Sequence, residues 1–410
     1  MLSDGKLRIL FITNSLPYPP ISGSRLRVYN LLRRIAEKHD VWIASFLNSS
    51  VAKEDLAHMS EFCAGLITAP EPRMHTLAHL PGLLRYGLAG KPLELKFYYS
   101  ENLAAQIRQL TSTVQFDVVQ IENPYMAPYI EVLDTRRPSV KLLDLHDATY
   151  DQHAQISRLP YSYGAVRQIR FWLNSVLMRR WEPKYAERFD GCIAVSERDR
   201  HTLIAANPRL HIDVIPNGVD TTRYEPLKAA EEANSLLFIG TMSYPPCSDA
   251  ALLLCQELLP RVRQHMGYTQ AWVVGAEPPP VIVGLNGNGI QVTGRVDDVV
   301  PYYRKCAVCA VPLRAGGGTR LKILEAMALG RPVVTTKIGC EGLDVADGEH
   351  LLIADSVELF VEQTVRLLTD GVLYQRIASN ARRLVVDRYD WDQIATKLMW
   401  CYSQLLDQSG

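Results

Sequence analysis

The chain has 410 residues, of which 47% are hydrophobic and 21% are charged, a composition typical of a soluble globular protein. Its 44 basic residues equal its 44 acidic residues, which excludes the overall positive charge of a nucleic-acid-binding protein. The length predicts two domains rather than one. The apolar run at 7–12 fits a buried strand better than a secretion signal, and no stretch is long enough to cross a bilayer. We expect a cytoplasmic protein with reduced cysteines.

Short apolar runs alternate with longer amphipathic stretches, which predicts βαβ units and parallel sheets. The strands predicted in the first half are 8–13, 41–46, 118–121, 141–145 and 191–195, with a helix at 25–38. Those predicted in the second half are 236–240, 271–274, 290–293, 307–312 and 332–335, and residues 373–406 are predicted to be largely helical. The predicted fold class is therefore α/β, with two doubly wound, Rossmann-like domains facing a central cleft.

A turn signal, Ile-Pro-Asn-Gly-Val-Asp at 215–220, separates the two sets of strands, and the polar stretch 228–234 follows it. We place the domain boundary in this region. Residues 1–212 are predicted to form an N-terminal domain and residues 213–388 a C-terminal domain. Residues 389–410 are predicted to form a helix that returns to the N-terminal domain.

The most informative segment is a glycine-rich loop that leads into a helix late in the chain. The glycines of Gly316–Gly318 free the backbone to approach a ligand, and Thr319 is expected to cap a helix that ends at Leu329. Arg320 and Lys322 lie in its first turn, where two cations oppose the helix dipole. An anion, above all a phosphate, would explain both cations, whereas the alternative of a tight strand–helix turn would not.

Further candidate ligand-binding residues lie in this helix and elsewhere in the chain. Glu325 lies one turn after Lys322 on the same helix face, where the ribose hydroxyls of a nucleotide would lie. In the first half, a proline-rich loop ends at Gly23 and Ser24, whose backbone could meet a phosphate or a sugar; a plain strand–helix turn is equally consistent. The predicted ligand-binding set is Gly23, Ser24, Gly240, Thr241, Arg295, Gly316, Gly317, Gly318, Thr319, Leu321 and Glu325.

The sequence Asp-Leu-His-Asp at 144–147 lies at a strand end, where such folds place their sites. His146 could contact a sugar hydroxyl or a developing charge, and a histidine with purely structural hydrogen bonds is the alternative. Asp144 and Asp147 could act as general base or metal ligands. Further ligands at metal-binding spacing are not evident, so we predict no metal.

A basic stretch from Arg167 to Arg188 is interleaved with the aromatic and aliphatic residues Phe171, Trp172, Leu173, Val176, Leu177 and Trp181. Such a stretch could contact anionic lipid headgroups or an anionic acceptor, as a peripheral membrane protein would. More often it is a solvated helix face over a buried apolar face. Both interpretations stay open from the sequence.

Together these motifs resemble retaining glycosyltransferases of family 4, which have the GT-B fold. The resemblance covers almost the whole chain. It rests on the segments 17–25, 144–147, 193–197, 214–220, 238–240 and 324–334. It implies transfer of a sugar from a nucleotide-sugar donor to an acceptor hydroxyl with retention of configuration, by front-face attack. The donor would be a substrate bound mainly in the C-terminal domain, with the acceptor on the N-terminal side and no metal or cofactor. The catalytic residues implied are His146, Arg320 and Lys322.

Two departures from the family pattern affect the predicted site. Gly317 stands where the family commonly has a glutamate that holds the donor sugar, whereas Glu325 matches the second, ribose-binding glutamate. Thr241 and Cys247 stand at or near the usual Arg and Lys that grip the diphosphate, a charge that Arg320 and Lys322 could replace. The alternatives are a sugar-nucleotide 2-epimerase and a pseudo-glycosyltransferase that binds the donor without transfer. The acceptor class implied is a polysaccharide, a glycolipid or a natural product.

Overall fold

The structure is a computed structural model that describes residues 5–48, 51–72, 86–87, 90–134, 136, 139–159, 164–228 and 230–409. The chain divides into two compact units. The first comprises Met1–Asp151, Trp172–Pro216 and Trp391–Gly410, and the second comprises Gln152–Phe171 and Asn217–Asp390. Within the described residues, the search for a helix long and apolar enough to cross a membrane found none.

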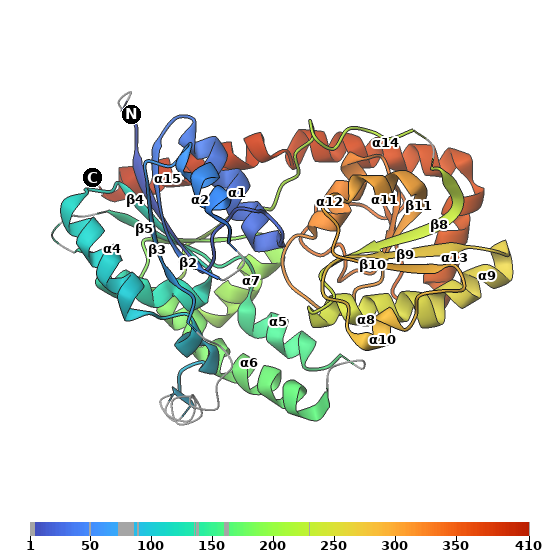
Figure 1. The fold of residues 1–410 in the computed structure, drawn as a ribbon, viewed down its shortest axis with the longest axis horizontal. Helices are drawn as coiled ribbons and strands as arrows, with labels where there is room; N and C mark the ends of the chain where they lie inside the picture. Colours follow the sequence, from blue (N-terminus) through green and yellow to red (C-terminus); the bar gives the residue numbers. More distant parts are fainter. Residues whose placement is uncertain are drawn as a thin grey trace. The chain divides into compact units, whose positions relative to one another are not determined.

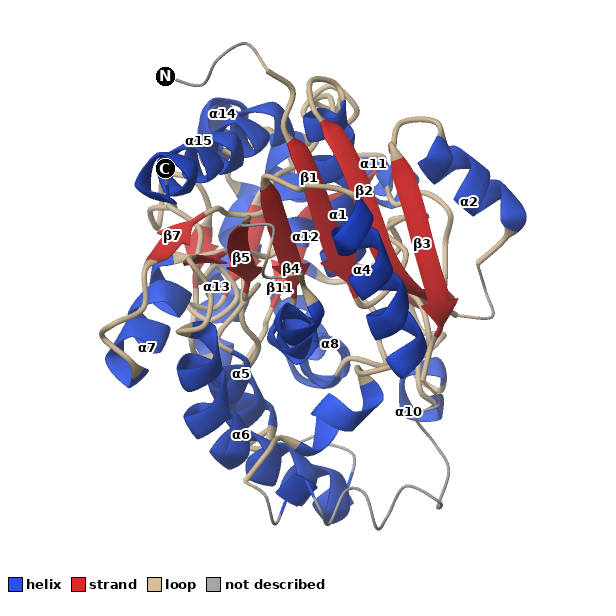
Figure 2. Cartoon of the chain, turned by 90° about the vertical axis from the view of Figure 1, so that its left-hand side faces the viewer, coloured by secondary structure: helices blue, strands red, loops and turns tan. Residues whose placement is uncertain are grey.

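The first unit contains a parallel sheet of seven strands in the order β3-β2-β1-β4-β5-β6-β7, and Figure 2 shows β3, β2, β1 and β4 side by side. Its central strands are almost fully buried, as runs such as Ile-Leu-Phe-Ile require when helices cover both faces. The strands are β1 (Arg8–Thr13), β2 (Asp40–Leu47), β3 (Gly65–Pro70), β4 (Val118–Glu122), β5 (Val140–Asp144), β6 (Gly191–Ala194) and β7 (Ile212–Val214).

Helices follow most of these strands and bury their apolar faces against the sheet. The last helix, α15, packs against α1 and β5 of this unit although it ends the chain. The helices are α1 (Gly23–Ala36), α2 (Lys53–Ser60), α4 (Glu101–Thr113), α5 (Thr149–Ile156), α6 (Gly164–Ala186), α7 (Glu197–Ala206) and α15 (Trp391–Ser409), with the 3-10 segments η2 (Leu93–Phe97) and η3 (Pro124–Val132). Helices α5 and α6 each have residues in both units.

The second unit contains a parallel sheet of six strands in the order β10-β9-β8-β11-β12-β13. These are β8 (Glu232–Ile239), β9 (Gln270–Val274), β10 (Ile290–Gly294), β11 (Cys306–Val311), β12 (Val333–Thr335) and β13 (Leu352–Ile353). Figure 1 shows α8 and α9 on one side of this sheet and α11, α12 and α14 on the other. The helices are α8 (Pro245–Leu253), α9 (Leu259–Met266), α10 (Pro280–Val283), α11 (Val300–Lys305), α12 (Leu321–Ala328), α13 (Val357–Thr369) and α14 (Gly371–Arg388).

Each sheet reverses its strand order at one point, between β1 and β4 in the first unit and between β8 and β11 in the second. Such a point opens a crevice at the carboxyl ends of the strands, because the connections on its two sides run in opposite directions. The loops that follow β8 and β11 carry Gly240 and the glycine-rich segment. The loop after β1 leads to Gly23, and β4 ends at Glu122.

The predicted α/β fold is confirmed: each unit is a doubly wound, Rossmann-like domain. All ten predicted strands occur, most with ends shifted by one or a few residues, whereas β3, β7 and β13 were not predicted. The arrangement of the two domains around a central cleft stays a prediction.

Candidate active site

Beside the switch point of the second unit, two glycines let the ends of β8 and β9 come close together. Gly275 has a φ of 146°, and a Cβ on it would lie 1.9 Å from the carbonyl oxygen of Gly240. No side chain fits in that space, so glycine is required at 275. Thr241, the residue after Gly240, is exposed beyond the carboxyl end of β8.

The loop after β11 is braced by side chains before it reaches the glycines. Arg314 donates from Nε and Nη2 to the Asp249 carboxylate at 2.9 and 2.7 Å, and the Thr336 hydroxyl donates to the Leu313 carbonyl. Gly316 and Gly318 then take φ values of 122° and 73°, which an L side chain rarely adopts. The glycine-rich segment is therefore held by its neighbours in a shape that needs glycine.

Helix α12 begins one residue later than predicted. Its N-cap is Arg320, with φ −84° and ψ 96°, so the expectation that Thr319 caps the helix was wrong. Arg320 is only 9% exposed and its Nη1 donates to the Gly317 carbonyl. Its Nε and Nη2 are buried, and no acceptor among the described residues reaches them. A buried donor without a partner costs free energy, and an acceptor bound at this helix N-terminus would remove that cost.

Lys322, the second residue of α12, points back toward the end of β8. Its Nζ lies 3.5 Å from Cys247 Sγ and 4.5 Å from the centre of the Phe238 ring. A Cβ on Gly240 would meet this Nζ at 2.9 Å, so glycine at 240 leaves room for the ammonium group. The structure thus brings Gly240 and Lys322 together beside the N-terminus of α12, where Arg320 is the N-cap.

Glu325 lies one turn further along α12 between two buried tyrosines. The hydroxyls of Tyr224 and Tyr303 lie 3.4 Å and 3.2 Å from its two carboxylate oxygens. Burial raises the pKa of Glu325 to about 7, although both hydroxyls and Lys322 act in the opposite direction. A carboxylate accepts about four hydrogen bonds, so it retains capacity for ligand hydroxyls.

The other residues predicted to bind the donor have varied surroundings. The Gly316 amide donates to Gln155 Oε1 at 3.1 Å, and the Thr319 carbonyl accepts from Asn217 Nδ2 at 3.3 Å, both within the second unit. Leu321 is the first residue of α12. Arg295 is exposed after the edge strand β10, two strands from β8, and forms no hydrogen bond or ion pair with another described residue.

In the first unit, Gly23 and Ser24 are the first two residues of α1, with Ser22 as its N-cap. The Ser22 and Ser24 hydroxyls lie 3.4 Å apart at the surface. The structure therefore places both residues at a helix N-terminus near the switch point, where the alternative of a plain strand–helix turn remains open.

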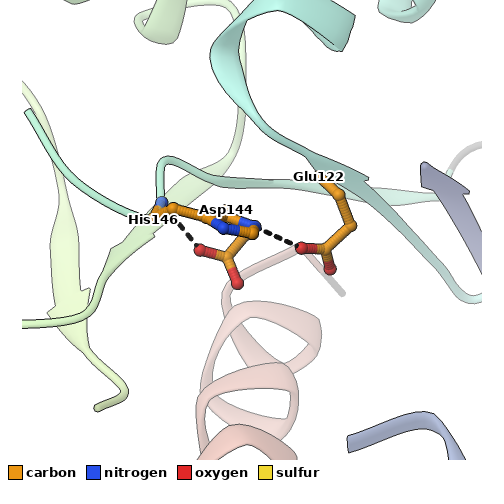
Figure 3. Close-up of side chains that lie close together, drawn as sticks. All are labelled: Glu122, Asp144 and His146. Atoms are coloured by element: carbon orange, nitrogen blue, oxygen red, sulfur yellow. Dashed lines mark hydrogen bonds and ion pairs between the residues drawn. The ribbon is translucent and has the colours of Figure 1, made fainter. Parts of the chain in front are cut away.

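His146 lies between two carboxylates at the ends of neighbouring strands, as Figure 3 shows. Its backbone N–H donates to Asp144 Oδ1 at 3.0 Å, and its Nε2 lies 2.8 Å from Glu122 Oε2. Glu122 and Asp144 are register partners in β4 and β5. His146 has a φ of 59°, a strained conformation of the kind that clusters at functional sites.

Further side chains hold these two carboxylates. Arg27 on α1 donates from Nε to Asp144 Oδ2 at 2.9 Å, and both side chains are almost fully buried. Gln120 Nε2 donates to Glu122 Oε1 at 2.6 Å, and the Tyr402 hydroxyl of α15 donates to Gln120 in turn. The cluster is electrically neutral when His146 is protonated, because two cations then face two carboxylates.

The titration of the cluster follows from this geometry. Burial alone would lower the pKa of His146, but the charge of Asp144 and the hydrogen bond to Glu122 outweigh it and raise that pKa. The Glu122 pKa is raised by burial and then by Asp144. A protonated imidazole has a donor on each ring nitrogen, so His146 in that form would keep one N–H besides the one facing Glu122.

Glu122 and Arg27 are the residues that sequence reasoning missed in this cluster. The available signal was a polar residue ending an otherwise apolar strand, Val-Val-Gln-Ile-Glu. Asp144, which the sequence analysis considered as a base or metal ligand, instead forms an ion pair with Arg27. Glu122, Asp144 and His146 do bring three potential ligand atoms within 4.8 Å of one another. Arg27 already supplies the positive charge beside Asp144, so the donor set favours an ion-pair network over a divalent cation.

Comparisons with known proteins identify the family to which the chain belongs. The family described as "Glycosyltransferase Family 4" matches residues 21–223, and "Glycosyl transferases group 1" matches residues 233–370. The chain is 28% identical over 231 residues to a phosphatidyl-myo-inositol mannosyltransferase of Mycobacterium tuberculosis, covering 53% of this chain and 60% of that protein. The match thus spans less than two thirds of that relative.

Two further similarities extend over nearly the whole chain. An uncharacterized 44.6 kDa protein in the cps region of Klebsiella pneumoniae is 22% identical over 406 residues, 95% of this chain and 98% of that one. The structure of Anabaena HepE in complex with UDP and glucose superposes with a TM-score of 0.67 at 17% identity, covering 97% and 99% of the two chains. The protein therefore belongs to the group 1 glycosyltransferases of family 4.

Proposed function

We propose that this protein is a retaining glycosyltransferase that moves a sugar from a nucleoside-diphosphate sugar to an acceptor hydroxyl. The observation that carries the proposal is Arg320, a nine-tenths buried guanidinium at a helix N-terminus with two donors that no described residue accepts. A diphosphate matches these donors in charge and geometry. Family membership supports the reaction class.

In the proposed reaction, the bond between the anomeric carbon and the diphosphate oxygen breaks, and the acceptor oxygen bonds to that carbon on the same face. The acceptor proton passes to the leaving phosphate oxygen. Negative charge develops on the diphosphate, where Arg320, Lys322 and the Gly317–Thr319 amides would stabilise it. Fixed cations offset this charge, so the proposed reaction needs no metal ion.

The remaining residues would select the two substrates. Glu325 would accept hydrogen bonds from ribose hydroxyls while the two tyrosines hold its carboxylate in place. His146, backed by Glu122, would contact the donor sugar or the acceptor. The named activity of the mycobacterial relative and the UDP and glucose bound to HepE support a hexose or related sugar as the group transferred. A glycolipid or polysaccharide would be the acceptor.

A thermal-shift screen of nucleoside diphosphates and their sugars tests the proposal, because a ligand that binds the native state raises the apparent Tm. We expect one nucleotide series to raise the Tm of the wild type and to have a much smaller effect on Arg320→Gln. A folded wild type that responds to no nucleotide would contradict the proposal. Product analysis without acceptor separates the alternatives, because an epimerase would convert the donor to its C2 epimer.

A further inference from the structure

Helix α6 buries polar as well as apolar side chains. The side chains it buries include Asn174, Ser175 and Glu182, all at most 7% exposed. Asn174 Nδ2 donates to the Tyr125 hydroxyl at 2.8 Å, and the Glu182 carboxylate accepts from two backbone amides at the start of α5. The solvated-face interpretation predicted a buried apolar side, but the buried side combines these polar groups with the apolar side chains of Met178 and Ala186.

Several large apolar side chains of α6 face outward. Val166, Ile169, Trp172, Leu173 and Val176 are 85%, 61%, 56%, 37% and 42% exposed. Four of them recur at intervals of three or four residues, which places them in one stripe along the first three turns of α6. Isolated exposed hydrophobic residues are ordinary, but a contiguous stripe on one helix marks an interaction surface.

Positive charge flanks and continues this stripe. Arg170 lies at its edge, and Arg179, Arg180 and Lys184 follow it on the exposed side of the last turns. Within the described part of the chain, Arg179, Arg180 and Lys184 form no salt bridge with a carboxylate. Because the protein as a whole has equal numbers of acidic and basic residues, this charge is a local feature of α6 rather than a consequence of composition.

We propose that the outer face of α6, defined by Val166, Ile169, Trp172, Leu173, Val176, Arg179, Arg180 and Lys184, docks onto an anionic lipid bilayer. The apolar turns enter the boundary between headgroups and acyl chains, and the cations meet lipid phosphates. Trp172 suits the headgroup level, where its ring is partly apolar and partly hydrated. This inference is independent of the proposed reaction, and neither stands or falls with the other.

Vesicle flotation tests the lipid assignment. Purified protein is mixed with vesicles of phosphatidylcholine alone or with about a third of phosphatidylglycerol, at low and high salt. We expect binding to the anionic vesicles at low salt and weaker binding in high salt, because salt screens the arginines. Equal binding to neutral and anionic vesicles, or no binding to either, would overturn the proposal.

Two pairs of variants locate the surface. Ile169→Ser with Trp172→Ser, and Arg179→Ser with Arg180→Ser, are each expected to weaken binding roughly 10- to 30-fold, the scale of two lost interfacial contacts. The matched apolar control is Val372→Ser with Trp400→Ser, whose side chains are 81% and 60% exposed elsewhere. The matched basic control is Arg383→Ser with Lys397→Ser, also exposed. Controls that lose binding as strongly would contradict the assignment to α6.

Sedimentation velocity over a range of concentrations separates the bilayer from a second copy of this chain. A membrane-docking face leaves the wild type and the Ile169→Ser, Trp172→Ser variant in the same oligomeric state. A wild-type dimer that this variant converts to a monomer would overturn the proposal, because the stripe would then be a subunit interface. Circular dichroism melting confirms that each variant is folded, as exposed substitutions change stability little.

Discussion

Lys322 Nζ lies 3.5 Å from Cys247 Sγ, which joins the start of α12 to the first turns of α8. Cys247 stands near the position where the resemblance to family 4 implies a lysine that would bind the diphosphate. The ammonium group beside Cys247 belongs to Lys322 on α12, the helix that follows the glycine-rich loop. The cation is thus supplied from a different element, and the small side chain at 247 makes room for it.

Removing this cation should weaken nucleotide binding. We predict that Lys322→Ala reduces the affinity for the cognate nucleoside diphosphate by about 1.5–3 kcal/mol, the scale of a hydrogen bond to a charged group. Isothermal titration calorimetry measures the change, and Arg383→Ala, an exposed cation on α14, is the control. Unchanged affinity in a folded Lys322→Ala protein would place the phosphates elsewhere.

The raised pKa of Glu325, about 7, predicts pH-dependent nucleotide binding. Below that pH the carboxyl is protonated and accepts ribose hydroxyls poorly, so affinity should fall from pH 8 to pH 6. Glu325→Gln has no charge to lose and should show a flatter profile. The Glu325→Gln substitution should also weaken binding of pyrophosphate, which has no ribose, less than binding of the nucleoside diphosphate. Equal losses for both ligands would mean that Glu325 orders the loop instead.

Glu122 should control the protonation of His146. We predict that Glu122→Gln lowers the His146 pKa, measured by NMR of the imidazole, whereas Glu349→Gln beside His350 leaves it unchanged. A folded-state pKa above the ordinary value of about 6.5 stabilises the protein below that pH, and this contribution disappears as pH rises through the raised pKa. An identical His146 titration in wild type and Glu122→Gln would show that Glu122 has no such role.

Metal dependence distinguishes the two interpretations of the Glu122, Asp144 and His146 cluster. If Arg27 supplies the charge beside Asp144, transfer should persist in excess EDTA, and added Mg²⁺ or Mn²⁺ should change the rate little. The rate of nucleoside diphosphate release, with and without chelator, gives the answer. Loss of activity in EDTA with rescue by Mg²⁺ or Mn²⁺ would instead identify a metal site.

The sequence predicted the central strands because each is a short apolar run bounded by turns. It missed β3 and β7 at the sheet edges, where Gly65–Pro70 is only partly buried and Ile212–Val214 is short. The candidate anion site around Arg320 and Lys322 could be proposed from the sequence because its loop, helix and charges are contiguous in the chain. The Arg27 pair with Asp144 joins residues 117 positions apart, so no local pattern indicates it. The exposure of the apolar residues on α6 could not be predicted from the sequence either, because it depends on which distant segments pack against the helix.

Release of nucleoside diphosphate from its cognate sugar donor tests the central claim most directly. The account predicts that the wild type releases nucleoside diphosphate, faster with an acceptor, and that the product retains the anomeric configuration of the donor by NMR. Lys322→Ala and Arg320→Gln should both slow the release. A folded wild type that binds the donor yet neither hydrolyses nor transfers its sugar to any acceptor tested would contradict the enzyme assignment and indicate a binding protein.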